Sequence, residues 1–290
     1  MSAVMAANDG QARTAIARLD AQARQIAMAS GGCQVTWRQF GKGEPLVLLH
    51  GGHGNWLHWA ANIERLSTQY TILVPDLPGY GGSDMPAEAS LASLVEATAD
   101  TLNQLVGAAT PIALSGFSFG GLVAANVAAG RGHVSRLVLI GPAGHGTARR
   151  PRGELRNWRD ALQTEDTESL RTIMRHNLKQ HMLYEPAAID ALAVRIHTDA
   201  CLRTRFRSKE ISRAGGLPDA LLRNWAPVLL VWGEHDVTAD PAALAPGLAA
   251  GVGCQSVVLG GVGHWAQYEG ADQINQLMLD FLAAGTGNTQ

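Results

Sequence analysis

The chain has 290 residues, of which 46% are hydrophobic and 17% are charged, and its formal net charge is −2. This composition excludes a disordered chain and a coiled coil, and a scale of roughly 150 residues per domain predicts one large domain or a core with an insert. The nearly balanced charge provides no field that would hold a polyanion, so we expect no nucleic-acid partner.

Membrane and disulfide signals are both weak. No run of 18 apolar residues occurs, so we expect no membrane partner. The three cysteines, Cys33, Cys201 and Cys254, are far apart and predict neither a disulfide framework nor a metal knuckle. They fit a reducing compartment, and we predict a cytoplasmic protein.

Residues 1–30 are predicted to form an N-terminal helical extension. Charged residues interrupt the apolar positions, so a secretory signal is not expected. Ile16, Leu19, Ala23 and Ile26 recur at helical spacing. Two interpretations stay open: a helix packed on the surface of its own chain, or an arm that forms a homodimer.

From residue 33 onward, strand patterns alternate with helix patterns. The predicted strands cover residues 35–40, 46–49, 70–74, 111–115, 137–140, 228–232 and 256–259. The predicted helices cover residues 56–66, 91–106, 122–129, 241–250 and 272–282. This alternation predicts the α/β class: a mostly parallel central sheet with helices on both faces.

The alternation stops at residues 143–222, where no buried strand pattern is found. We therefore predict a helical cap over 143–222, inserted into an α/β core made of residues 31–142 and 223–290. The cap is rich in arginine, which either forms a solvated face or steers anionic substrates. The cluster consists of Arg149, Arg150, Arg152, Arg156 and Arg159.

The segment from Gly116 to Gly120 matches the pattern G-x-S-x-G and places Ser118 between a buried strand and a helix. This is the context of a nucleophile elbow, where a strained turn requires glycine two residues before and after the serine. The helix N-terminus adds partial positive charge where an anion develops. We predict Ser118 as the nucleophile.

A serine hydroxyl needs a base, and the base needs an acid that orients it. Asp236 follows one predicted buried strand and His264 follows the last one, so both belong at the carboxyl edge of the sheet with Ser118. We predict a Ser118–His264–Asp236 triad. The competing bases and acids are His50, His53, His235, Glu234 and Asp240.

Acyl transfer also requires donors for the developing oxyanion, each worth about 3–4 kcal/mol. We expect the backbone N–H groups of Phe119, directly after the nucleophile, and of Gly52, in a glycine-rich loop. His50, His53 and His58 surround that loop without a matched cysteine or carboxylate cluster, so we expect no metal. The reaction needs no cofactor.

Together these segments resemble the α/β-hydrolase fold enzymes over about residues 33–284. The resemblance is carried by His50-Gly51-Gly52, the run from Asp76 to Gly81, the Ser118 elbow, the run from Gly233 to Asp236, and Gly263-His264. It implies that fold, with the insert as its helical cap. Serine in the elbow, rather than aspartate, disfavours the haloalkane dehalogenase and epoxide hydrolase branches.

The segment from Gly263 to Glu269 is similar to the histidine segment of the meta-cleavage-product hydrolases, which split carbon–carbon bonds in ring-fission products of aromatic degradation. That resemblance implies a cap arginine that binds a substrate carboxylate, and Arg195 lies at a comparable place. The alternative for Arg195 is an ion pair with a nearby acid.

Aromatic residues near these segments either line a substrate pocket or belong to the core. They are Trp56, Trp59, Phe117, Phe119 and Trp265. The sequence therefore predicts a serine hydrolase acting on a small-molecule ester or related acyl compound, with an apolar, aromatic or anionic part. The alternatives are carbon–carbon hydrolysis of a vinylogous diketo acid, acyl transfer or perhydrolysis by the same triad, and a binding protein on an inactive hydrolase scaffold.

Overall fold

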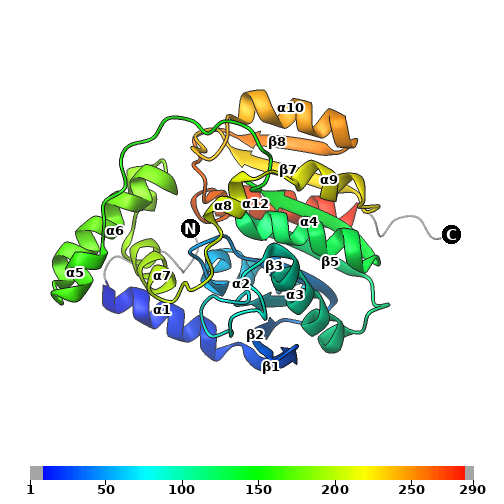
Figure 1. Ribbon diagram of the computed structural model, residues 1–290, viewed down its shortest axis with the longest axis horizontal. Coiled ribbons are helices and arrows are strands. Elements are labelled where there is room, and N and C mark those ends of the chain that lie inside the picture. The colour runs from blue at the N-terminus through cyan, green and yellow to red at the C-terminus, as the bar shows by residue number, and fades with distance from the viewer. Residues whose placement is uncertain (1–8, 285–290) are drawn as a thin grey trace.

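The computed structural model describes residues 9–284 and contains one eight-stranded sheet (Figure 1). The strand order is β1-β2-β4-β3-β5-β6-β7-β8. Strands β3 to β8 are parallel to one another, whereas β1 and β2 are antiparallel to their neighbours. The strands are β1 (Arg24–Ser30), β2 (Cys33–Phe40), β3 (Glu44–Leu49), β4 (Tyr70–Pro75), β5 (Ile112–Phe117), β6 (Val134–Ile140), β7 (Val228–Gly233) and β8 (Gln255–Leu259).

The central strands are buried on both faces, which explains their continuous apolar runs. In β3, Leu46 and Leu48 belong to one hydrophobic cluster, and Val47 and Leu49 belong to a second cluster. This division follows from the two-residue period of a strand, which sends successive side chains to opposite faces. The sheet therefore separates two cores, and each core needs its own layer of helices.

Helices cover the two faces of the sheet as two groups (Figure 1). The first group is α3 (Leu91–Val106), α4 (Phe119–Arg131) and α10 (Pro241–Val252). The second is α2 (Ile63–Leu66), α11 (Ala266–Glu269) and α12 (Ala271–Ala283), with the short helix η1 (Trp56–Trp59) nearby. Among residues 9–284, no helix has the length and hydropathy needed to cross a bilayer.

The N-terminal region differs from the predicted helical extension over 1–30. Helix α1 (Asp9–Ala21) is shorter, and residues 24–30 form the edge strand β1, paired with β2. Gly31 and Gly32 both have positive φ and close this hairpin, because such turns match the twist of the strands. The prediction was wrong for 24–30 because strand pairing overrode the helical spacing; residues 1–8 lie outside the described residues.

The segment between β6 and β7 contains helices and no strand, but residues 141–158 form neither, so the helices of the predicted 143–222 insert begin only at Arg159. Helices α6 and α7 pack against each other, α1 packs on α7, and α9 packs on α4. In Figure 1 most of this segment lies beside α1, away from α3 and α4. Its helices are α5 (Arg159–Gln163), α6 (Thr167–His181), η2 (Pro186–Ala188), α7 (Ala191–Leu202), α8 (Lys209–Arg213) and α9 (Leu217–Leu222).

Candidate active site

Ser118 occupies a sharp turn between β5 and α4. Its backbone has φ 53° and ψ −118°, a left-handed conformation that costs energy for any residue with a Cβ. A Cβ at Gly116 would lie 2.3 Å from the Gly120 carbonyl oxygen, and one at Gly120 would lie 2.3 Å from that of His50. The two glycines therefore allow the backbone contacts that hold this strained turn in place.

The predicted triad residues form one hydrogen-bonded chain. His264 Nε2 lies 2.9 Å from Ser118 Oγ, and His264 Nδ1 lies 2.7 Å from Asp236 Oδ2. Asp236 is fully buried and His264 is 3% exposed, whereas Ser118 is half-buried. Because Nδ1–H donates to the carboxylate, Nε2 is the nitrogen that accepts the serine proton.

Asp236 is held as a carboxylate in spite of its burial. Burial raises its pKa, but the charge and hydrogen bond of His264 and the hydrogen bonds of Thr238 outweigh burial and leave the pKa below its ordinary value. Thr238 donates both its backbone N–H and its hydroxyl to Asp236 Oδ1, each over 2.7 Å. Thr238 therefore positions the acid, a role that the sequence analysis missed.

Gly141, directly after β6, lies next to the side chains of Asp236 and His264. A Cβ there would lie 2.9 Å from Asp236 Oδ2 and 3.1 Å from His264 Nδ1, and the residue has φ +48°. Both the space and the backbone conformation therefore favour glycine. No sequence motif marked this position.

His50, a competing base, has a structural role. Its Nε2 accepts a hydrogen bond from the Leu77 N–H (2.9 Å), and its Nδ1 lies 2.8 Å from the Gly51 carbonyl oxygen. Burial lowers its pKa to about 4, so the ring is neutral. With both nitrogens engaged by backbone, His50 braces the loop and has no nitrogen free for a nucleophile.

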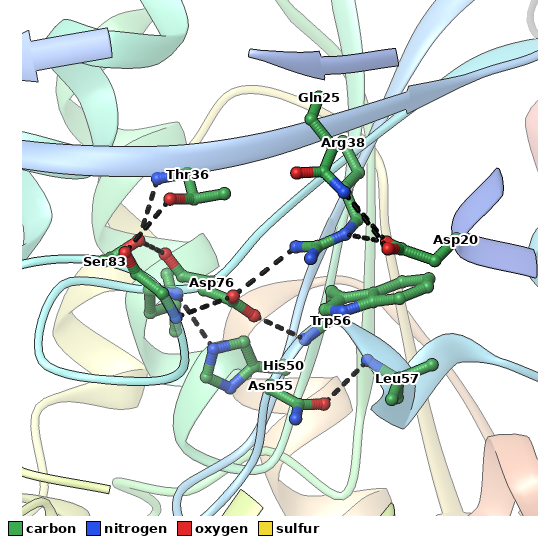
Figure 2. Close-up of polar contacts among 12 residues, drawn as sticks. Asp20, Gln25, Thr36, Arg38, His50, Asn55, Trp56, Leu57, Asp76 and Ser83 are labelled. Atoms are coloured by element: carbon green, nitrogen blue, oxygen red, sulfur yellow. Dashed lines mark hydrogen bonds and ion pairs between the residues drawn. The ribbon is translucent and has the colours of Figure 1, made fainter. Parts of the chain in front are cut away.

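Asp76, beside His50, belongs to the same bracing network (Figure 2). Its two oxygens accept hydrogen bonds from the N–H groups of Trp56 and Gly82, each over 3.0 Å. Arg38 lies between Asp20 and Asp76, 2.8 Å and 3.5 Å from their oxygens (Figure 2). This network fixes the path of the glycine-rich loop that follows β3.

The other competing groups are engaged elsewhere. His235 stacks on Tyr184 with ring centroids 3.5 Å apart. Asp240 forms an ion pair with Arg150, with 2.7 Å between the charged atoms. Glu234 Oε2 accepts a hydrogen bond from the Gly261 N–H over 2.9 Å. None of these contacts involves Ser118. His53 is exposed, with φ 52°.

The glycine-rich loop lies directly beside the nucleophile. A Cβ at Gly51 would be 3.1 Å from Ser118 Cβ, and one at Gly52 would be 3.7 Å from Phe119 Cβ. Phe119 is the first residue of α4, and first-turn N–H groups have no carbonyl partner within their helix. The loop and the helix start therefore approach each other beside Ser118, as an oxyanion site requires.

All five aromatic residues predicted as pocket candidates are at most 4% exposed and belong to the two hydrophobic clusters, but they differ in their neighbours. The Phe117 ring lies 4.9 Å from that of His264, and Phe119 packs on Phe206 at 5.9 Å. Trp265 directly follows His264 and donates its indole N–H to the His58 carbonyl over 2.9 Å. The Phe117 ring therefore contacts His264 directly, whereas Phe119 and Trp265 adjoin the predicted triad through their places in the chain, next to Ser118 and His264.

Trp56 and Trp59 contact other parts of the core. Trp56 stacks on Phe40 at 6.0 Å and under the Arg38 guanidinium at 4.4 Å. Trp59 is fully buried in the cluster that contains α2 and α12. For these two residues the structure agrees with the core interpretation rather than with a substrate pocket.

Arg195, on α7, is engaged by carboxylates of this chain. Its Nε donates to Asp199 over 2.8 Å, and a terminal nitrogen lies 3.7 Å from Asp9 on α1. The charges of Asp199 and Asp9 outweigh the effect of burial and raise the pKa of Arg195. The structure therefore supports the ion-pair interpretation of Arg195, not a carboxylate anchor beside the triad.

Two further histidines lie near the site: His58, which the sequence analysis considered only as a metal ligand, and His181, which it did not consider. His58 Nδ1 accepts the Gly51 N–H at 3.2 Å, which leaves the proton on Nε2, an atom without a partner among residues 9–284. The His181 ring on α6 lies 5.8 Å from that of His264. Burial and the nearby His264 lower the pKa of His181 to about 3, so this ring is neutral.

Glu269 ties the histidine loop to the helical segment. Its carboxylate accepts hydrogen bonds from the N–H groups of Gly263 (2.6 Å), Tyr184 (2.9 Å) and Glu185 (2.6 Å). Burial raises the pKa of Glu269. This contact gives the loop that carries His264 a defined position. Across residues 9–284, no three His, Cys, Asp or Glu side chains are grouped to hold a metal ion.

Comparisons with known proteins identify the family of the chain. A family model for the alpha/beta hydrolase fold matches residues 44–271. The dihydrolipoyllysine-residue acetyltransferase component of the acetoin cleaving system of Pseudomonas putida is 29% identical over 270 residues, covering 87% of this chain and 67% of that protein.

A second relative is the 2-hydroxy-6-oxononadienedioate/2-hydroxy-6-oxononatrienedioate hydrolase of Klebsiella pneumoniae, 29% identical over 265 residues, which covers 83% of this chain and 87% of that protein. An esterase structure from a Rhodococcus species superposes with a TM-score of 0.74 at 23% identity, covering 91% of this chain and 99% of that one. The chain belongs to the α/β hydrolase fold family, as the resemblance predicted, and is a hydrolase.

Proposed function

We propose that the chain is a serine hydrolase that cleaves a small ester or related acyl substrate through Ser118, His264 and Asp236. The observation that carries the proposal is the hydrogen-bonded chain from hydroxyl to imidazole to carboxylate, with distances of 2.9 and 2.7 Å. An imidazole with one nitrogen on a buried carboxylate and the other on a serine hydroxyl is the arrangement that activates serine.

The acylation step follows from that geometry. Ser118 Oγ forms a bond to the substrate carbonyl carbon while its proton passes to His264 Nε2, and the carbonyl electrons move onto oxygen. The N–H groups of Gly52 and Phe119 would hold this oxyanion. When the tetrahedral intermediate collapses, the bond to the leaving alcohol breaks and His264 returns the proton to its oxygen.

Deacylation repeats the same steps with water. His264 Nε2 takes a proton from water, whose oxygen attacks the acyl carbon, and the bond to Ser118 Oγ breaks as the proton returns to Oγ. Asp236 stays ionised throughout and stabilises the imidazolium that forms in each half-reaction. An alcohol in place of water would give acyl transfer, and a peroxide would give perhydrolysis. The ratio of these products to the hydrolysis product distinguishes the three reactions.

A fluorophosphonate probe tests the nucleophile directly. Ser118 attacks phosphorus and expels fluoride, so we expect the wild-type protein to be labelled and Ser118→Ala to remain unlabelled. Ser115→Ala is the matched control, because its buried hydroxyl on β5 has no partner among the described residues. Equal labelling of both variants would refute the assignment, and an unlabelled wild-type protein would favour a binding protein.

Carbon–carbon hydrolysis is the second candidate. It is supported by relatives named as dienedioate and phenylhexadienoate hydrolases, matched over 83% and 86% of this chain. The ion pairs of Arg195 argue against the carboxylate anchor that this reaction would use. Turnover of a neutral aryl ester and of a ring-fission acid, measured side by side, distinguishes the two reactions. Faster turnover of the acid, together with a large loss of that turnover in Arg195→Ala, would favour carbon–carbon cleavage.

A further inference from the structure

A pocket of about 300 Å³ lies between the loop after β6 and helix α8. The two segments are joined by a hydrogen bond from the Gly144 N–H to the Ser212 carbonyl oxygen, over 3.0 Å. None of the predicted triad residues lines this pocket. The lining residues are His145, Gly146, Thr147, Arg149, Ser212 and Arg213.

Two arginines line this pocket without a matching acid. No carboxylate of residues 9–284 lies within ion-pair distance of Arg149 or Arg213, whereas the adjacent Arg150 pairs with Asp240 at 2.7 Å. Burial and the nearby Arg213 both lower the pKa of Arg149. Two cations that share one cavity repel each other, and an anion between them would remove that repulsion.

The remaining lining groups also suit an anion. Ser212 provides a hydroxyl, whereas the Thr147 hydroxyl lies 2.8 Å from His145 Nδ1, which also accepts the Thr147 N–H over 3.1 Å. The neutral His145 ring therefore carries its proton on Nε2. Guanidinium groups form paired hydrogen bonds with the oxygens of carboxylates and phosphates, so these are the anions that fit.

The pocket is close to the acid of the predicted triad. The charge of Asp236 acts on His145, which lines the pocket, and Thr238 donates two hydrogen bonds to Asp236. The charge of Asp236 also acts on Arg149. A charge placed in the pocket would therefore lie within electrostatic reach of the residues that activate Ser118.

We propose that the pocket between the loop after β6 and α8 binds a small oxyanion, a carboxylate or phosphate, between Arg149 and Arg213. Such a carboxylate or phosphate can be the acidic end of the substrate itself, or it can be a free anion that modulates turnover.

Titration calorimetry with inorganic phosphate in a low-salt chloride buffer tests the pocket. We expect saturable binding to wild-type protein and to Ser118→Ala, weakened by roughly tenfold or more in Arg149→Gln and in Arg213→Gln, since a hydrogen bond to a charged group is lost. Arg171→Gln, an exposed arginine on α6, is the matched control and should bind as wild type. No saturable binding, or equal binding by all variants, would overturn the proposal.

Ester kinetics then distinguish the two sources of the anion. The kinetic experiment rests on the proposed function, whereas calorimetry on Ser118→Ala does not. If the pocket holds the acidic end of the substrate, phosphate competes with the mono-aryl ester of a dicarboxylic acid but not with a neutral aryl ester. Arg149→Gln then raises KM for the acidic ester alone. If the anion is free, phosphate changes kcat for both esters. Unchanged turnover of both at saturating phosphate would overturn the link to catalysis.

Discussion

Two buried acid–histidine regions lie at the carboxyl edge of the sheet, and they differ in what the histidine contacts. Asp236 follows β7 and contacts His264, while Asp76 follows β4 close to His50. Both acids are almost completely buried. By residue type and strand position alone, either region would be a candidate for acid–base chemistry.

The second ring nitrogen separates the two regions. His50 has a backbone partner at each nitrogen, whereas His264 uses one nitrogen for Asp236 and the other for the Ser118 hydroxyl. A saturated imidazole braces a loop, while an imidazole that faces a hydroxyl can move a proton. The partners of the histidine, rather than its burial or its proximity to an acid, therefore indicate function.

The largest expected effect comes from Asp236→Asn. An amide at this position would donate to His264 Nδ1 and force the proton onto Nε2, which then cannot accept the Ser118 proton. We expect kcat for an aryl ester to fall about 10⁴-fold. Steady-state kinetics measure the effect, with a thermal melt to confirm that the variant is folded. A loss of less than tenfold would contradict the role of Asp236.

The His50 region should respond to pH through stability instead. Burial lowers the pKa of folded His50 to about 4, whereas an unfolded histidine titrates near 6.5. The unfolded chain therefore binds the extra proton as pH falls from 6.5 toward 4, and folded-state stability is lost over that range. At pH 5 this one residue should account for about 2 kcal/mol of the lost unfolding free energy.

Urea unfolding at pH 7.5 and pH 5 measures that loss. His50→Asn should show a smaller pH dependence than wild type, since the asparagine does not titrate. His133→Asn is the control, because His133 is exposed and its φ of 46° is one that asparagine readily adopts. The same pH dependence in His50→Asn as in wild type would disprove the contribution of His50.

The smallest expected effect is that of Gly141→Ala. The added methyl group would press on Asp236 and His264 at 2.9 and 3.1 Å, so we expect kcat to fall about tenfold through misplacement of the pair. Gly130→Ala, on α4, adds a methyl group into open space and should leave kcat unchanged. If the two substitutions behave alike in the ester assay, the packing of Gly141 does not control the pair.

The sequence predicted most of the sheet and the central chain of the site. Continuous apolar runs such as 46–49 and 228–232 indicated buried parallel strands, because a strand covered on both faces has no polar side. The elbow was predictable because its glycines and serine are adjacent in sequence. Strand β1 was missed, since an edge strand is defined by pairing with β2 and carries only weak apolar alternation.

Three predictions on the substrate side did not match the contacts in the structure. Trp56 and Trp59 were candidates for a pocket but pack in the core, and Arg195 pairs with Asp9 and Asp199. Which way a side chain points from a helix depends on the elements packed against it. His181 and Thr238 had no motif and became visible only through their contacts with His264 and Asp236.

Local periodicity and short motifs were enough to predict the α/β class and a helical insert, and to propose Ser118, Asp236 and His264 as nucleophile, acid and base. Only the tertiary structure decided which histidine faces the serine and which arginines lack an acid. Those contacts join residues separated by dozens to more than a hundred positions, and packing rather than local pattern sets them.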